Sequence, residues 1–502
     1  MNSSDAESDE LPLPHEQLKD YPFKFNFASI KKLISNIFPL EPEYQDNIEL
    51  DGTDAVVILF FTALGMITRI FRIQFPSSIV YEEGHYGNLT NSYLRGQYFH
   101  DNHPPLAKLI MTGIAHYAGY NGEYNFYKQD YPTMTYVAMR MTPAFLGALC
   151  VPLSYLLMRF MKCSHFASFF SAILIMSDLL LIVEARHYLF EGILHFFICL
   201  SIFSIFLYER TMTIFTFIFE GFCLGCMAAC KYTSGGVVIF ALIRQFCLLN
   251  NSFLFGFIRA LLLCLIISIV HLMCFTVHLM ALPFLPDEVF LNNSIFIPKS
   301  VRNGLVDRLN SDWDARAHAP SLVTRAIDLV CSMIYQSFRS KESIPHSSRW
   351  YSWPLFNCEW IPFWSKNGKY IICLGNVLLW YPVFIGIVWN LIVTLIRKDF
   401  RSTRACLLYG YLLSLVPFAL VPRNLCLYNY AIPLIFGVYN LAMMIEKEMK
   451  PVYRGFFFSL VMTMAIFGYL HWSHLAYGLT IPDLNFLIWN KKWVGELLQT
   501  DV

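Results

Sequence analysis

Charged residues are scarce in this chain of 502 residues: Asp, Glu, Lys and Arg make up 15% of it, whereas hydrophobic residues make up 56%. A soluble globular protein of this length carries more charge, because charged side chains cover its surface. The formal net charge is only +1 and the sequence has no basic tract, which argues against a nucleic-acid partner. The composition therefore predicts a polytopic membrane protein.

Several familiar signals are also missing. The N-terminal part is rich in Asp and Glu, so residues 1–52 are expected to form a cytosolic tail with no cleavable signal peptide. Within this tail, the short amphipathic stretch SIKKLISNIF is expected at the membrane surface. Cys223 and Cys226 have no second ligand pair beside them, so we expect no zinc or redox motif there. Cys331 and Cys358 fall in one polar loop and could form a disulfide if that loop is luminal.

Long apolar runs are what the chain has in abundance. A helix needs roughly 17–25 apolar residues to cross a bilayer. Eleven candidate spans lie near residues 54–73, 133–158, 165–184, 187–208, 213–230, 232–249, 254–282, 370–396, 405–421, 427–446 and 454–472. The fifth and sixth are the least clearly separated, because Lys231 is the only break between them. The predicted fold is an all-α polytopic membrane protein with about 11 transmembrane helices.

The distribution of Lys and Arg predicts the orientation of these spans. Positive residues cluster in alternate connections, and positively charged connections face the cytosol. The lumen then receives two large loops, 74–132 and 283–369, and the C-terminal tail 473–502. The first loop lies within the N-terminal transmembrane half, 53–282, which we expect to be catalytic, and the last helices lie in 370–472.

The second luminal loop contains a helical pattern. In the stretch SLVTRAIDLVCSMIYQSF, the apolar residues Leu322, Ala326, Leu329 and Met333 recur roughly one turn apart. We expect a helix that lies along the membrane surface or covers the rest of the protein.

The stretch YEEGHYGNLTNSYLRGQYFHDNHPPLAK, residues 81–108, concentrates ionisable side chains directly behind the first apolar run. Its acids and imidazoles are Glu82, Glu83, His85, His100, Asp101 and His103. Such groups are costly to desolvate at a membrane edge, so a functional site is the default interpretation. Desolvation also raises the pKa of a carboxyl group, which makes it a better base for a hydroxyl. We expect Glu82 and Glu83 to be catalytic, one as the base and the other orienting it or binding a partner.

Arginines near the same face suggest an anionic ligand. Arg140 lies in the second span, Arg186 at the start of the fourth and Arg423 just before the tenth. A lipid-linked phosphate would satisfy them, because a guanidinium binds phosphate oxygens in a bidentate fork. The alternative for Arg140 and Arg186 is structural pairing with acids such as Glu184 or Glu191.

A divalent metal is a further interpretation of the acidic loop. Carboxylates and imidazoles at Glu83, His85, Asp101 and His103 could hold magnesium or manganese. Their spacing is not diagnostic, so no metal site is predicted.

Six motifs in order resemble the protein O-mannosyltransferase family. EE-x-HYG followed by YFHDNHPPLAK resembles that family's first luminal loop, YVAMRMTPAFLGALCVPL its second span and EARHYLFEGILHFF its R-x-x-LLD segment. HSSRWYSWPL, LGNVLLW and RNLCLYNYAIP resemble three further family elements nearer the C-terminus. The HPP loop and the S-x-x-WPL element are the specific ones.

The resemblance implies a type-C glycosyltransferase in the endoplasmic reticulum membrane. It would transfer mannose from dolichyl-phosphate-mannose to Ser or Thr hydroxyls of luminal proteins by an inverting single displacement. It would work as a dimer with itself or a relative, with no cofactor beyond the lipid-linked donor. By position, Glu82 matches the family's acidic base and Glu83 its partner. The residues implied to bind substrate are Asp101, His103, Arg140, Arg186, Glu191 and Arg423.

The chain also departs from the family pattern. Glu82 and Glu191 stand where the family has Asp, and Asn429 stands where it has His. The 283–369 loop is too short for the β-trefoil (MIR) domain that eukaryotic members usually carry there. Two alternatives follow: a type-C transferase that uses another lipid-linked sugar or acceptor, and a non-catalytic partner of an active mannosyltransferase.

Overall fold

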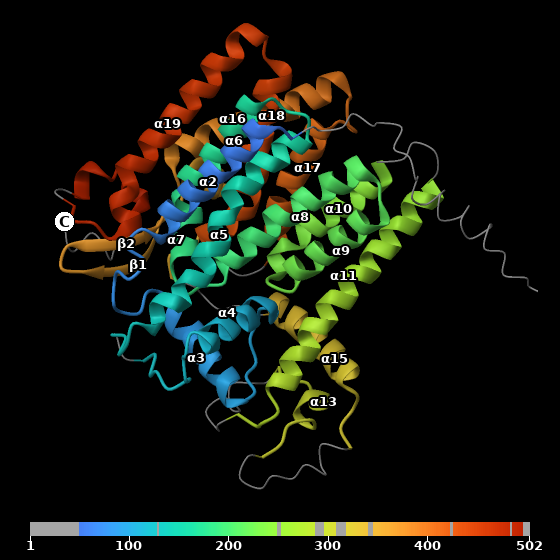
Figure 1. Cartoon of the computed structure of the whole chain (residues 1–502), viewed down its shortest axis with the longest axis vertical. Coiled ribbons are helices and arrows are strands. Elements are labelled where there is room, and N and C mark those ends of the chain that lie inside the picture. Colours follow the sequence, from blue (N-terminus) through green and yellow to red (C-terminus); the bar gives the residue numbers. More distant parts are fainter. Residues whose placement is uncertain are drawn as a thin grey trace, which may run out of the picture.

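The structure is a computed structural model, and it describes residues 50–127, 130–247, 253–286, 296–307, 318–339, 345–421, 425–481 and 484–494. The expected tail and its interfacial stretch lie outside these residues, apart from the first residues of the first helix. The fold is mostly helical, with a large helical bundle above a smaller group of elements at one end (Figure 1).

The N-terminal half of the bundle comprises α2 (Gly52–Ile70), α5 (Thr135–Phe160), α6 (His165–Ser177), α7 (Leu179–Arg186), α8 (Glu191–Thr211), α9 (Ile214–Ala228), α10 (Gly235–Cys247) and α11 (Phe253–Ala281). The C-terminal half comprises α16 (Val377–Arg397), α17 (Thr403–Leu415), the 3-10 turn η3 (Val416–Leu420), the 3-10 turn η4 (Leu427–Tyr430), α18 (Ala431–Glu448) and α19 (Pro451–Tyr477). α18 is the most deeply buried of the long helices, and α2, α11 and α19 show broad apolar faces at the outside.

Within the described residues, eight helical segments are long and apolar enough to cross a membrane, and the bent pair α6 and α7 would make a ninth. Each of the eleven predicted spans contains a helix, but two of these helices are too short to meet that length. The fifth and sixth contain the short helices α9 and α10, of 15 and 13 residues. The chain is a multi-pass membrane protein.

The third predicted span is not one straight helix, because α6 and α7 meet at an angle of 55°. The Asp178 carboxylate caps α7 by accepting a hydrogen bond from the backbone N–H of Leu181 at 3.1 Å, and it accepts another from the Trp380 indole at 2.7 Å. The Arg69 guanidinium donates to the carbonyls of Ile175 and Met176 at the end of α6. The backbone groups that the break leaves without helical partners are thus bound by side chains.

Close contact between α5 and α8 positions the N-terminal ends of both helices. A Cβ atom at Gly192 would lie 2.4 Å from the carbonyl oxygen of Pro143. Only glycine fits at that separation, since real Cβ contacts are longer. The first residue of α8, Glu191, is therefore held next to α5.

The smaller group of elements comprises α3 (Glu83–Arg95), α4 (Leu106–Tyr117), α13 (Lys299–Arg302) and α15 (Leu322–Arg339). Four 3-10 turns belong to the bundle instead. η1 (Tyr232–Ser234) connects α9 to α10, η2 (Trp350–Leu355) contacts α16, and η5 (Leu484–Phe486) and η6 (Lys491–Trp493) pack against α19. The expected loop helix is confirmed as α15, which buries Ala326, Leu329 and Met333. It packs beside the lower end of α11 (Figure 1). Cys331 is exposed and Cys358 is buried, and both are free thiols, so the suggested disulfide between them is wrong.

One β-hairpin departs from the all-helical expectation. Strands β1 (Ile361–Lys366) and β2 (Lys369–Cys373) pair antiparallel, with a register shift between Pro362 and Trp364. Asn367 and Gly368 form the connection with φ of 54° and 67°, the left-handed conformation that two-residue hairpin turns require. Strand β2 lies against α7 and α19. Strand β1 contacts the segment that precedes α3, because the carbonyl of Phe363 accepts a hydrogen bond from the backbone N–H of Tyr81.

Candidate active site

A cavity with a volume of about 400 Å³ lies where α3, α8, α10, α15 and the η3–η4 segment meet. Its polar end is lined by Glu82, Tyr86, Asn102, His103, Glu191 and Lys231. Its opposite end is lined mainly by apolar residues of α10, α17 and η3, among them Ile239, Leu413, Pro417 and Leu420. Ile239 and Leu420 are 46% and 78% exposed at the outside of the bundle. The lining therefore combines a charged part, which we call the charged end, with an apolar part, the apolar end, that includes side chains exposed at the outside of the bundle.

Two carboxylates line this cavity: Glu191, which is paired with Lys231, and Glu82, which has no such partner among the described residues. Glu82 stands at the N-terminus of α3, and the hydrogen bond that its carboxylate accepts within the described residues comes from the Tyr86 hydroxyl at 3.4 Å. Burial raises the pKa of Glu82, and the nearby negative charge of Glu191 raises it further, whereas Lys231 acts in the opposite direction. A partly buried carboxyl with a raised pKa and few partners suits a general base.

The backbone just before Glu82 is held in an unusual conformation. Tyr81 has a φ of 48°, which non-glycine residues seldom adopt. Its backbone N–H donates to the carbonyl of Phe363 at 3.0 Å, and the two rings stack with centroids 4.3 Å apart. Such strain costs about 1–3 kcal/mol and persists when surrounding contacts enforce it. Strand β1 supplies those contacts and so fixes where α3 begins.

Glu83 has a different environment from its neighbour. It is fully buried and accepts two hydrogen bonds from the Arg140 guanidinium, both at 2.7 Å. It also accepts from the backbone N–H groups of Val80 and Tyr188 and from the Tyr131 hydroxyl, at 2.8 to 3.0 Å. Five donors therefore saturate this carboxylate, and none of its contacts faces the cavity.

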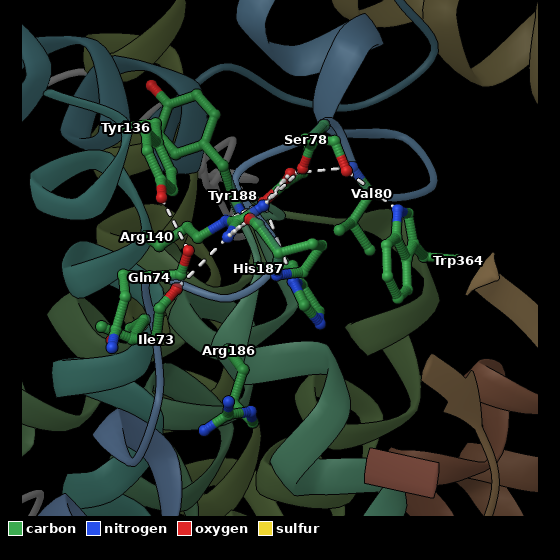
Figure 2. A network of polar contacts seen from close by, with 12 residues as sticks. Ile73, Gln74, Ser78, Val80, Tyr136, Arg140, Arg186, His187, Tyr188 and Trp364 are labelled. Carbon is green, nitrogen blue, oxygen red and sulfur yellow. Dashed lines mark hydrogen bonds and ion pairs between the residues drawn. The ribbon is translucent and has the colours of Figure 1, made fainter. Parts of the chain in front are cut away.

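Arg140 is likewise saturated by the protein. Besides Glu83, it donates to the backbone carbonyls of Ile73, Pro76 and Ser78. Figure 2 shows Arg140 at the centre of this network, with the Ile73 and Ser78 oxygens pointing toward it. The geometry favours the structural alternative for Arg140, with Glu83 as the partner in place of Glu184 or Glu191.

Arg186 lies apart from this network (Figure 2). It is buried, donates to the carbonyl of Arg69 at 3.0 Å and stacks its guanidinium on the Tyr477 ring, 4.4 Å from the centroid. It does not line the cavity, and its predicted partner Glu191 points elsewhere. Arg423 lies outside the described residues.

Asp101 organises the HPP loop. Its carboxylate pairs with the buried ammonium of Lys108 and lies 3.8 Å from the His85 ring, and Lys108 also donates to the carbonyl of His103 at 2.6 Å. Burial alone would raise the pKa of Asp101, but Lys108 and His85 hold that pKa well below its usual range. The His103 ring itself packs on Phe190, with centroids 5.0 Å apart, and lines the cavity.

The HPP loop also contacts α15. The His100 ring hydrogen-bonds to the Gln336 side chain of α15 at 2.7 Å. Ile334 and Ser337, on the same helix, line the cavity. α15 therefore forms part of the cavity wall as well as covering the bundle.

Lys231 is the functional candidate that the sequence analysis did not single out. It is 6% exposed, and its ammonium lies 3.3 Å from Glu191 and 5.0 Å from the ring centroids of both Phe190 and Tyr428. Its signal in the sequence was its isolation, since a single lysine between two apolar runs is expensive without a function. Asn429, which stands where the family has His, also lines the cavity.

The residues considered for a metal do not form one cluster. Glu83 is engaged by Arg140, while Asp101 and His85 lie together beside Lys108. Among the described residues, a group with metal-ligand spacing occurs elsewhere, at Asp51, Asp54 and His165. There the Asp54 carboxylate forms an ion pair with the Arg159 guanidinium at 2.9 Å, so its negative charge is already compensated by the protein.

Comparison with solved structures defines the class of fold. A chain of the Saccharomyces cerevisiae protein O-mannosyltransferase Pmt1–Pmt2 complex bound to the sugar donor matches with a TM-score of 0.76 at 16% identity, covering 92% of this chain and 94% of that chain. Archaeoglobus fulgidus oligosaccharyltransferase in the apo form matches with a TM-score of 0.50 at 14% identity, covering 86% of this chain and 57% of that chain. The chain therefore has the type-C glycosyltransferase fold.

Sequence comparison gives the family. Residues 59–284 match the family described as dolichyl-phosphate-mannose–protein mannosyltransferase, and residues 323–495 match the C-terminal four-transmembrane region of protein O-mannosyltransferase. The chain belongs to the protein O-mannosyltransferase family.

Individual relatives match over limited lengths. Dolichyl-phosphate-mannose–protein mannosyltransferase 1 of Saccharomyces cerevisiae is 34% identical over 157 residues, covering 30% of this chain and 19% of the relative. Protein O-mannosyl-transferase 1 of Danio rerio is 32% identical over 185 residues, covering 36% of this chain and 25% of the relative. The matched segments thus span about a fifth to a quarter of these relatives.

Proposed function

We propose that this chain transfers mannose from dolichyl-phosphate-mannose to Ser or Thr hydroxyls of proteins in the lumen of the endoplasmic reticulum. The observation that carries the proposal is the two-ended cavity. Its charged end offers Glu82 as a base and Lys231 as a cation, and its apolar end is lined by residues of α10 and η3. A donor with a sugar, a phosphate and a long isoprenoid chain needs a charged environment at its sugar phosphate and an apolar environment along its lipid.

The apolar end suits the lipid part of the donor. At this wall α10 and α17 approach closely, since a Cβ at Gly236 would lie 2.3 Å from the carbonyl oxygen of Leu413. Ile239 and Leu420 extend the apolar lining to the outside of the bundle. The isoprenoid chain would leave along these residues into the bilayer, which keeps its apolar surface out of water.

The charged end of the cavity suits the reaction in which the acceptor hydroxyl displaces dolichyl phosphate from the mannose. The acceptor hydroxyl oxygen forms a bond to the anomeric carbon as the bond from that carbon to the phosphate oxygen breaks. The hydroxyl proton passes to Glu82, and dolichyl phosphate leaves from the opposite face, so the configuration inverts. The leaving group is a stable anion, so it needs positive charge and no general acid, and Lys231 supplies that charge.

The other residues in and around the cavity divide into two roles. His103 and Asn102 line the cavity and would orient the sugar, while Glu191 holds the Lys231 ammonium. Glu83 and Arg140 would fix the start of α3, and Asp101 would fix the HPP loop through Lys108.

The experiment is mannose transfer from dolichyl-phosphate-mannose to a Ser/Thr-rich peptide, comparing wild type with Glu82→Gln. The chain would be tested alone and co-expressed with a relative, because we propose that it works as a dimer. Activity that disappears in the variant supports the proposal. Activity that survives moves the base to another residue. No transfer by folded wild type in either setting would favour another lipid-linked sugar or a non-catalytic partner role.

A further inference from the structure

Two buried ionisable side chains lie behind the charged end of the cavity without touching it. Glu184 of α7 is 1% exposed and His195 of α8 is 3% exposed. His195 Nε2 lies 3.2 Å from Oε2 of Glu184, within ion-pair distance but without the alignment of a hydrogen bond. His195 is one helical turn after Glu191, so both side chains lie on the same face of α8. The pair thus adjoins the Glu191–Lys231 ion pair.

This pair has unused bonding capacity, which buried polar groups seldom have. In the described part of the chain, the Glu184 oxygens, Nδ1 of His195 and Oε2 of Glu191 have no hydrogen-bond partner. The charged or titratable groups whose electrostatic effect reaches the pair are Glu191, Lys231, Asp178, Cys373 and Arg69. None of these five side chains donates a hydrogen bond to the Glu184 carboxylate.

A charge count shows what the arrangement requires. With Glu184 and Glu191 ionised, Lys231 protonated and His195 neutral, the four side chains carry a net charge of −1. An uncompensated buried charge is costly, and a single proton on Glu184 or His195 brings the net charge to zero. The same proton removes a negative charge from behind the subsite where an anionic phosphate would bind.

We infer that Glu184 and His195 share one proton and act as a positioning pair that sets the charge behind the phosphate subsite. The inference rests on the proposed function, because that function supplies the phosphate. When the pair releases its proton to solvent as the pH rises, a negative charge appears behind Lys231. That charge opposes the donor phosphate and competes for the lysine, so donor binding weakens.

The test is binding of dolichyl-phosphate-mannose to the purified full chain in detergent micelles, followed by tryptophan fluorescence at several pH values. This probe is suitable because its phosphodiester keeps a single negative charge across the range. We expect wild-type affinity to fall about tenfold from the acidic to the alkaline end of the range, as the pair loses its proton and one unit charge appears nearby. Glu184→Gln should lose most of this fall in affinity, because its pair stays neutral. The part that persists would come from Glu82, which lines the same cavity and titrates as well.

Two further variants make the test specific. His195→Gln leaves Glu184 as the single proton site, so the fall in affinity should move to lower pH. Glu220→Gln is the matched control: Glu220 is also a buried carboxylate, but it bonds to Gln245 in α10 and does not line the cavity. It should keep the wild-type pH dependence.

Identical pH dependence in wild type and Glu184→Gln would overturn the inference, since the titrating group would then lie elsewhere. A uniform loss of affinity at all pH values in folded Glu184→Gln would also overturn it, because that result indicates a structural role alone. Failure of every protein, wild type included, to bind the donor would instead overturn the proposed function.

Discussion

Glu82 and Glu83 are neighbours in the sequence, yet the structure predicts opposite consequences when each is replaced by glutamine. Glu83 accepts five hydrogen bonds inside the protein, two of them from Arg140. A glutamine at that position loses the charge and turns one acceptor oxygen into a donor that faces other donors. Arg140 is then left as a buried cation without a counter-charge. Breaking a buried ion pair in this way costs about 3–5 kcal/mol.

Glu82→Gln removes far fewer stabilising interactions than Glu83→Gln does. The side chain has a single long hydrogen bond, and it lies near Glu191, whose negative charge disfavours its ionised form. We therefore expect the melting temperature of Glu82→Gln to match or slightly exceed that of wild type. Its transfer rate should fall by about 10²–10⁴-fold, the usual contribution of a general base.

The melting temperatures of Glu82→Gln and Glu83→Gln, measured in detergent by tryptophan fluorescence, distinguish the two roles. Glu83→Gln should lower the melting temperature by about 3–5 °C, from a loss of about 3–5 kcal/mol in a chain of this size. Glu123→Gln is the surface control, since Glu123 is exposed and bonds only to Asn121 among the described residues. A Glu83→Gln protein that melts like wild type but cannot transfer mannose would refute this division of roles.

Three further outcomes follow from the same geometry. The fall of kcat/KM with decreasing pH should reflect the raised pKa of Glu82, and Glu191→Gln should move that acidic limb to lower pH by removing a neighbouring negative charge. Asp101→Asn should cost about 3–5 kcal/mol at neutral pH by leaving a buried lysine unpaired. Because the pKa of Asp101 is depressed in the folded state, its contribution is complete above about pH 4 and is lost below that, so the wild-type and variant melting curves should converge in acid. Gly192→Ala should yield little folded protein because its Cβ would collide with α5, whereas Gly113→Ala, with open space around its Cβ, should be neutral or gain up to about 1 kcal/mol in unfolding assays.

Much of the fold could be predicted because long apolar runs and helical periodicity are local signals. The helices in the eleven predicted spans and α15 were found in this way. The break at Asp178 was missed because residues 165–184 form one apolar run, although a lone acid within it was a signal for a buried cap. The hairpin was also missed, although Asn367-Gly368 between strand-forming residues is a strong turn signal.

The candidate site was only partly predictable, because pairing across the fold is not encoded in local spacing. Glu82, His103 and Glu191 do meet at one cavity, as a shared site requires. Nothing in the sequence showed that Arg140, 57 residues after Glu83, would form a salt bridge with that carboxylate. Lys231 could have been found by asking what a lone cation in an apolar stretch must bind.

The contacts on either side of Glu82 fix the backbone from which a glutamate reaches at a position where the family pattern has aspartate. Tyr81 is fixed by β1 through its backbone N–H and its ring, and Glu83 is fixed by five donors. The backbone of Glu82 therefore has little freedom, and the reach of its side chain alone decides where the carboxylate lies. One additional methylene group shifts that carboxylate by about 1 Å, which is enough to change a rate greatly. Glu191 is also one methylene longer than the family's aspartate and holds Lys231 at the same end of the cavity, so the base and the cation could shift together and keep their separation.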